Sequence, residues 1–140
     1  MIAAVCLDDR GGMRFNHRRQ SRDRLLYDDL IRLCGTIWVR EASVPLFSAH
    51  ADRIRIAEDP LSAAGPGECC FVEDDPLTDI PLEGMIVYRW NRLYPADLFL
   101  TPAPADRGMI LISSTEFPGS SHERITREIW RATYDQIEIQ

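Results

Sequence analysis

Short apolar and β-branched stretches alternate along the chain with polar segments rich in charge, proline and glycine. Apolar runs of this length, bounded by turn-forming residues, are typical of buried strands. The pattern predicts such strands over residues 2–7, 36–39, 68–73, 85–90 and 109–114. Residues 53–58 alternate polar and apolar side chains, which is typical of a half-exposed strand.

The longest helical pattern covers residues 22–34, where apolar side chains recur at helical spacing and form one stripe. Ser21 is the expected N-cap, and Asp23 falls in the first turn, where the helix dipole favours an acid. Gly35 is the expected stop. A shorter helix is predicted over residues 41–49, interrupted by Pro45. Residues 13–20 are predicted to form a polar loop.

Local signals leave the segment after residue 119 open. Residues 120–123 fit a capping box before Ile125 and Ile129, which favours a helix slightly. Residues 125–130 also suit the return strand of a hairpin whose turn is Pro118–Gly119. Taken in order, the elements predict one α/β domain over residues 1–140 with a mixed central sheet.

Composition narrows the class of protein. The 140 residues are 45% hydrophobic and 27% charged, as in an ordinary folded domain that needs neither a disulfide nor a metal ion. No apolar run is long enough to span a membrane, and the first residues lack the basic region and cleavage site of a signal peptide. Sixteen basic residues, all arginine, stand against 22 acids, so the net charge is −6 and we expect no nucleic-acid binding.

The charges are segregated along the chain. Arginines cluster within residues 14–24, whereas residues 56–88 contain acids and no basic residue. Both regions are consistent with solvated surface. The alternative is a corner near the arginines that attracts anions, or a homodimer in which the arginines of one copy meet the acids of another.

Cysteine and histidine usage gives no sign of a preformed metal or thiol site. Cys6, Cys34, Cys69 and Cys70 lie in apolar stretches and form no Cys-x-x-Cys pair, so we expect reduced thiols in a cytoplasmic protein. The three histidines lack metal-ligand spacing. His122 is expected to be structural, because its neighbours in sequence do not make a catalytic triad by adjacency.

Several segments, in this order, are similar to the dihydrofolate reductase family. Residues 9–16, Asp-Arg-Gly-Gly-Met-Arg-Phe-Asn, resemble its flexible first loop, and Asp23 opens the first helix near the place of its active-site carboxylate. Residues 33–40, 53–56 and 94–102 resemble further family segments. Residues 114–117 with 120–122 and 128–130 resemble its closing hairpin, so the resemblance favours a strand there. It implies a mostly parallel sheet with flanking helices and a C-terminal β-hairpin.

The chain departs from the family at the cofactor site. The family has a glycine pair after its fifth strand that lets the backbone approach the cofactor diphosphate, and this chain has Glu73, Asp74 and Asp75 there. Three carboxylates would oppose a diphosphate. Residues 18–20 also replace the family's Pro-Trp. We therefore expect no bound cofactor.

The resemblance places a ligand cleft between the first loop and the first helix, for a small anionic or heteroaromatic ligand. Asp23 would be its catalytic acid, with a pKa raised by an apolar cleft; otherwise Asp23 is simply an acid at a helix start. We expect Met13, Phe15, Asp23 and Tyr27 to line the cleft. Arg18, Arg19 and Arg22 are expected at its mouth.

These observations favour a degenerate reductase-like domain that acts as a ligand-binding or protein-interaction module. An open cleft would support the ligand-binding role, and a closed cleft would support the protein-interaction role. An NADPH-dependent reductase of a pteridine-like or other small heterocycle is the alternative. For a short bacterial chain of this kind, a third and weakest alternative is an RNA-processing hydrolase such as ribonuclease Z. The His-x-His-x-Asp-His zinc motif of that enzyme has no counterpart in this sequence.

Overall fold

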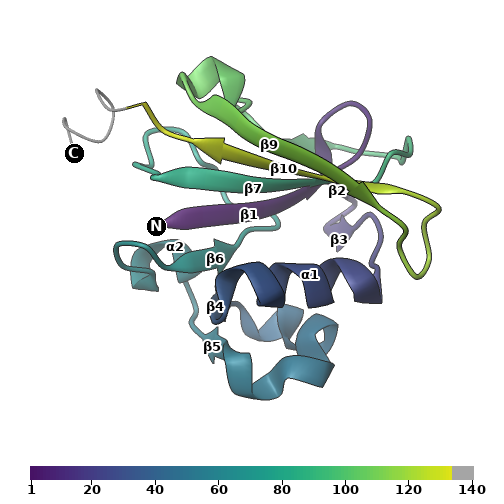
Figure 1. Cartoon of the computed structure of the whole chain (residues 1–140), viewed down its shortest axis with the longest axis horizontal. Helices are drawn as coiled ribbons and strands as arrows, with labels where there is room; N and C mark the ends of the chain where they lie inside the picture. Colours follow the sequence, from purple (N-terminus) through teal and green to yellow (C-terminus); the bar gives the residue numbers. More distant parts are fainter. Residues whose placement is uncertain (134–140) are drawn as a thin grey trace.

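A computed structural model describes residues 1–133, in which a seven-stranded sheet has the order β5-β4-β6-β1-β7-β10-β9 (Figure 1). The five strands from β5 to β7 are parallel to one another, whereas β10 is antiparallel to both β7 and β9. The chain is thus one α/β domain with a mixed, mostly parallel sheet. The strands are β1 (Ile2–Leu7), β4 (Ile37–Val39), β5 (Ile54–Ile56), β6 (Cys69–Phe71), β7 (Gly84–Arg89), β9 (Ile110–Phe117) and β10 (Ile125–Arg131).

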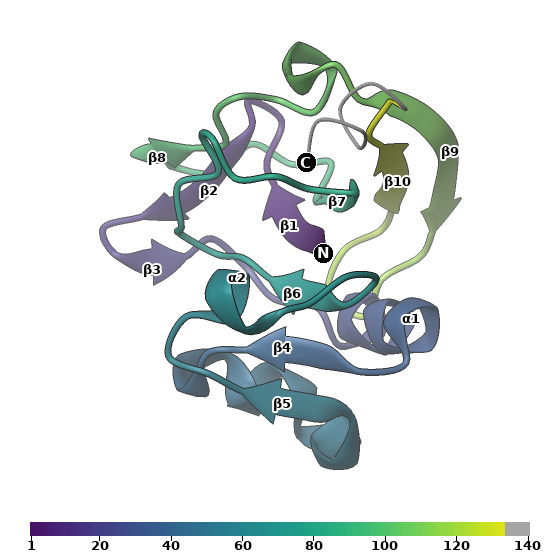
Figure 2. The ribbon, with the colours of Figure 1, turned by 90° about the vertical axis from the view of Figure 1, so that its left-hand side faces the viewer.

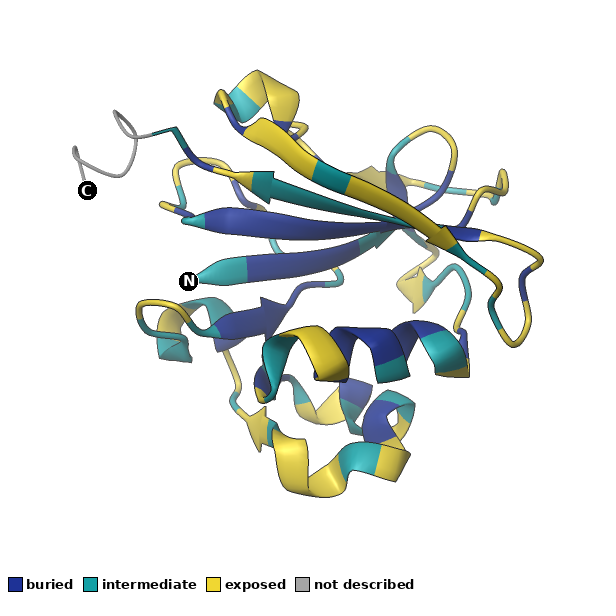
Figure 3. Cartoon of the chain, in the orientation of Figure 1, coloured by how far each residue is buried: buried dark blue, intermediate teal, exposed yellow. Residues whose placement is uncertain are grey.

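Burial explains why the central strands are nearly continuous apolar runs. β1 pairs with β6 on one side and β7 on the other, and side chains from both faces of these strands are buried. On one face α1 (Arg24–Cys34) contributes Leu26 and Leu30 to the core. On the other face Leu77, Leu82 and Met109 from loops cover the sheet. Figure 3 shows β1, β6 and β7 as largely buried strands.

The first helix begins two residues later than its pattern predicts. Asp23, not Ser21, is the N-cap: it is extended, and its carboxylate accepts hydrogen bonds from the Leu25 and Leu26 amides at 3.0 and 3.4 Å. Gly35 is confirmed as the stop, with φ +76° and its amide bonded to the Ile31 carbonyl. The second helical segment is a 3-10 helix, Glu41–Arg53, kinked at Phe47 and His50, so it runs four residues beyond the expected end.

The arginine-rich segment is not the predicted loop. It forms a hairpin of β2 (Gly12–Phe15) and β3 (Arg18–Arg19), which joins β8 (Leu98–Phe99) in a small sheet of its own (Figure 2). Asn16 and His17 both have positive φ, 52° and 62°, as a two-residue hairpin turn requires. The short helical turns α2 (Pro60–Ala63) and η2 (Ala105–Arg107) complete the described elements.

The C-terminal ambiguity is settled in favour of a strand. β10 pairs with β9 along its whole length and with β7 from Thr126 to Arg131. The capping signals at residues 120–123 are overridden because two neighbouring strands satisfy the backbone of this segment. None of the helices among residues 1–133 has the length and apolarity that crossing a lipid bilayer requires.

Candidate functional site

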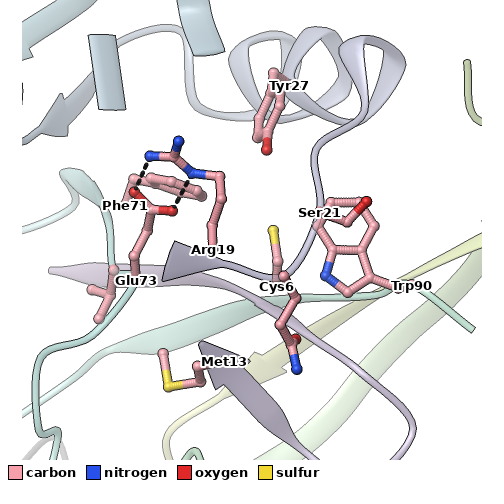
Figure 4. Close-up of a pocket in the computed structure, with 10 residues that line it drawn as sticks. Cys6, Met13, Arg19, Ser21, Tyr27, Phe71, Glu73 and Trp90 are labelled. Atoms are coloured by element: carbon pink, nitrogen blue, oxygen red, sulfur yellow. Dashed lines mark hydrogen bonds and ion pairs between the residues drawn. The ribbon is translucent and has the colours of Figure 1, made fainter. Parts of the chain in front are cut away.

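A cleft lies at the carboxyl ends of β1 and β6, under the β2–β3 hairpin and beside α1 (Figure 4). Ligands of open α/β sheets bind in such a position, in the crevice outside the carboxyl ends of neighbouring parallel strands whose following connections diverge. The space is small: its volume is about 20 Å³, room for about one water molecule. The lining residues are Cys6, Met13, Arg19, Gln20, Ser21, Tyr27, Phe71, Val72, Glu73 and Trp90.

An ion pair closes the cleft, so the open cleft that would by itself support a ligand-binding module is not present in this structure. Arg19 on β3 donates from Nε to one oxygen of Glu73 at 2.8 Å and from Nη2 to the other at 3.0 Å. The Ser43 hydroxyl also donates to Glu73. Burial alone would raise the pKa of Glu73, but the bonds from Arg19 and Ser43 outweigh it and leave the pKa below its ordinary value. The pair is therefore ionised, with Glu73 13% exposed and Arg19 30% exposed.

Apolar side chains surround this pair. The Tyr27 ring packs against Phe47, with centroids 5.3 Å apart, and meets Phe71 edge-on at 6.1 Å. Burial, and then the nearby thiol and carboxylate, raise the pKa of Tyr27 far above its ordinary value. Burial and then Glu73 do the same for the pKa of Cys6. Both groups stay protonated at neutral pH, so neither is an anionic nucleophile.

The acids after β6 are paired within the chain. Arg14 bonds Asp74 at 3.2 Å, and Arg40 bonds Asp74 at 3.0 Å and also Asp75. The three carboxylates expected to oppose a diphosphate are therefore each paired with an arginine of the same chain, which weakens their repulsion of an anion. The same pairing means that the arginine cluster already meets the acidic stretch of its own chain. No helix starts in residues 72–83, so this loop offers no helix N-terminus to a phosphate.

Asp23 does not face the cleft. Only 1% exposed, it accepts bonds from the Ser120 and Ser121 amides at 2.9 and 2.8 Å besides those of its own helix. A side chain at Gly119 would collide with this carboxylate. Burial would raise the pKa of Asp23, but these amides and His122 outweigh it and hold the pKa well below its ordinary value. The expected raised pKa is wrong, and the reading of Asp23 as a helix-start acid holds.

His122 lies at the centre of a network that sequence spacing did not reveal. Its Nδ1 is 3.1 Å from the Asp23 carboxylate, and its Nε2 is 2.8 Å from the Tyr94 hydroxyl and 3.2 Å from that of Ser21. Its ring stacks on Trp90 at 4.6 Å. The groups are those of a nucleophilic triad, but the Tyr94 hydroxyl is closer to Nε2 than the Ser21 hydroxyl is, so Ser21 is not the main partner of the imidazole. Through these bonds His122 holds the β9–β10 loop against the start of α1.

The structure brings together only part of the expected site. Met13, Arg19 and Tyr27 line the cleft, whereas Phe15, Arg18 and Arg22 are exposed outside it. The site expected from the sequence did not include Cys6, Phe71, Glu73 and Trp90, which also line the cleft. The position of Phe71 and Glu73 at the end of a buried strand was the available signal, because strand ends carry ligand sites in such sheets.

No group of three or more metal-ligating side chains occurs among residues 1–133. All four thiols are free; Cys69 and Cys70 are buried, and Cys6 and Cys34 half-buried. No family model and no curated protein matches the chain.

Proposed function

We propose that this protein binds a small heteroaromatic ligand in the cleft under the β2–β3 hairpin, with Glu73 as the anchoring group. The scaffold is proposed to be a shortened, diverged domain of the dihydrofolate reductase type. The parallel strands closed by the antiparallel β9–β10 pair, and an acid at the start of the first helix, support that assignment.

The observation that carries the proposal is the Arg19–Glu73 ion pair within an apolar cleft. A cleft that had simply collapsed would be filled by apolar side chains. This one is closed by two charged groups on opposite walls, and a buried ion pair contributes little to stability because desolvation offsets its attraction. The pair is thus suited to exchange one partner for a ligand.

The two partners differ in how easily they are displaced. Arg19 lies on a two-residue strand of a small hairpin and reaches solvent, whereas Glu73 is more buried and follows a central strand. Displacing Arg19 leaves a solvated guanidinium, but displacing Glu73 leaves a buried carboxylate unpaired, which costs more. A ligand with two adjacent N–H donors, as in a protonated aminopyrimidine, replaces the Arg19 fork on Glu73. Tyr27 and Phe71 offer aromatic faces for its ring.

Calorimetry with 2,4-diaminopyrimidine as the probe tests this assignment. Glu73→Gln is expected to weaken binding about tenfold or more, a loss of about 1.4 kcal/mol, because it removes the charge that the probe meets. Arg19→Ala is expected to tighten binding, since it removes the competing cation. Asp74→Asn, which changes the adjacent exposed carboxylate, should leave the affinity unchanged.

Unchanged affinity in Glu73→Gln would overturn the proposal. So would tighter binding of benzoate than of the probe together with its loss in Arg19→Ala, because Arg19 would then be the anchor and the ligand an anion. Circular dichroism of each variant checks that the fold is retained.

We further expect no appreciable NADPH-dependent reduction of a pteridine. The loop after β6 has neither a helix N-terminus nor free cations for a diphosphate, since Arg14 and Arg40 are already paired. Titration of NADPH by fluorescence is expected to show no saturation at micromolar concentration. Micromolar binding with hydride transfer to any pteridine would contradict this expectation and favour the alternative, a reductase of a small heterocycle.

A further inference from the structure

One buried polar atom of the cleft has no hydrogen-bond partner in the described chain. Among residues 1–133, four buried side-chain nitrogen or oxygen atoms lack a partner, and three of them are arginine Nε atoms whose guanidinium groups bond elsewhere. The fourth is Oε1 of Gln20, and of these four residues only Gln20 lines the cleft. A buried acceptor that stays unpaired is costly, so this oxygen calls for a donor from outside the described chain.

The orientation of the Gln20 amide is fixed by its nitrogen. Nε2 donates to an Asp8 carboxylate oxygen at 3.3 Å and to the Pro95 carbonyl oxygen at 3.2 Å. Both partners accept hydrogen bonds, so the amide nitrogen must face them and the amide oxygen must take the other position. Gln20 therefore offers the cleft an acceptor and not a donor.

Asp8 keeps this orientation in place. It is fully buried, and its carboxylate accepts the amides of Gly12 at 2.7 Å, Arg10 at 2.9 Å and Tyr94 at 3.2 Å. Burial would raise the pKa of Asp8, but these amide bonds outweigh it and leave the pKa below its ordinary value. An ionised carboxylate has no proton to donate, so the Gln20 amide cannot turn over without setting its oxygen against that of Asp8.

Gln20 and Glu73 border the cleft from the ends of neighbouring strands. Asp8, which holds Gln20, directly follows β1, whereas Glu73 follows β6, the parallel neighbour of β1. Both residues line the same cleft. A ligand that takes the place of Arg19 on Glu73 therefore meets a second acceptor in Gln20.

We propose that Gln20 Oε1 is the second anchor of the ligand and selects heterocycles that carry a further N–H donor away from the edge that Glu73 binds. This inference rests on the proposed ligand site. The N–H fork of the ligand bonds the Glu73 carboxylate, and an exocyclic amino group across the ring donates to Gln20 Oε1. A ligand with a methyl group at that position leaves Oε1 buried and unpaired, so the cleft discriminates against it.

Calorimetry of the unmodified chain with two probes tests this assignment. 2,4-Diaminopyrimidine presents the N–H fork and a 4-amino group, whereas 2-amino-4-methylpyridine keeps the fork and has a methyl group in place of that amino group. We expect 2,4-diaminopyrimidine to bind about tenfold more tightly or more, because only its 4-amino group donates to Gln20 Oε1.

Gln20→Met removes the acceptor and keeps the length of the side chain. It is expected to weaken the binding of 2,4-diaminopyrimidine about tenfold and to leave that of 2-amino-4-methylpyridine within about twofold. Each probe is compared between the two proteins, so a difference in basicity between the probes cancels. Arg18→Met is the matched control: Arg18 lies on β3 but is exposed outside the cleft, so the preference between the probes should persist.

Equal affinities of the two probes for the unmodified chain would overturn this inference and leave Glu73 as the anchor. Equal weakening of both probes by Gln20→Met would also overturn it, because Gln20 would then only shape the cleft through its bond to Asp8. If neither probe binds the unmodified chain, the proposed function and this inference both fail. The comparison in the unmodified chain needs no variant, so it decides the question even if circular dichroism shows that Gln20→Met does not fold.

Discussion

Changing Asp23 to asparagine is expected to lower the free energy of unfolding at neutral pH by about 2 to 3 kcal/mol. The carboxylate caps α1 and also accepts the Ser120 and Ser121 amides, and an amide side chain cannot accept all of these bonds. Urea unfolding followed by circular dichroism measures the loss. Probe binding in the cleft should be unaffected, because Asp23 does not line it.

The loss should depend on pH. The pKa of Asp23 is lowered in the folded protein, so its stabilisation is fully present above the ordinary carboxyl pKa of about 4 and fades as pH falls further. The difference in stability between the unmodified chain and Asp23→Asn should therefore shrink below about pH 4. A constant difference from pH 7 to acid would contradict the assigned ionised state.

Asp59→Asn provides the control for this pair of measurements. Asp59 also precedes a helix as its N-cap, but its exposed side chain bonds no helix amide, only the Ser62 hydroxyl. Its replacement should change stability by no more than about 0.5 kcal/mol. Because Asp59 makes no cap bond, equal losses in the two variants would mean that neither the cap bonds of Asp23 nor its bonds to the Ser120 and Ser121 amides contribute to stability.

The buried strands and the first helix could be predicted from sequence because each has a local pattern of apolar residues. β1, β6 and β7 are covered on both faces and read as apolar runs, and α1 carries one apolar stripe. The β2–β3 hairpin was missed because its turn, Asn16-His17, lacks the glycine that usually marks positive φ. The capping signal before β10 favours a helix locally, but hydrogen bonding to the two neighbouring strands β7 and β9 stabilises the strand instead.

The site could be predicted only in part, because its decisive pairs are distant in sequence. Arg19 and Glu73 are 54 residues apart, and Asp23 and His122 are 99 apart. No periodicity links such positions; the strand order brings them together. Charge segregation was visible, but whether the acids meet their own arginines or another copy's depends on where the loop after β6 folds back.

A second buried network should be as sensitive as the first. Asp29 of α1 accepts bonds from Arg127 Nη1 of β10, at 2.8 and 2.9 Å, and from the Tyr88 hydroxyl of β7 at 2.7 Å. Burial and then Asp29 raise the pKa of Tyr88, so the phenol stays a donor. Arg127→Met is expected to lower the free energy of unfolding by about 3 kcal/mol, because it leaves the buried Asp29 carboxylate with only the largely exposed Arg32 as a cation.

Two further variants separate burial from charge in this measurement. Arg124→Met removes an arginine from the loop just before β10. Its ion pair with Glu116 is exposed, so the free energy of unfolding should fall by less than about 1 kcal/mol. Adding Asp29→Leu to Arg127→Met removes the stranded charge and should recover part of the stability, since an apolar pair often replaces a buried ion pair at little cost. A double variant less stable than Arg127→Met would show instead that the Asp29 bond to Tyr88 is what holds α1 to the sheet.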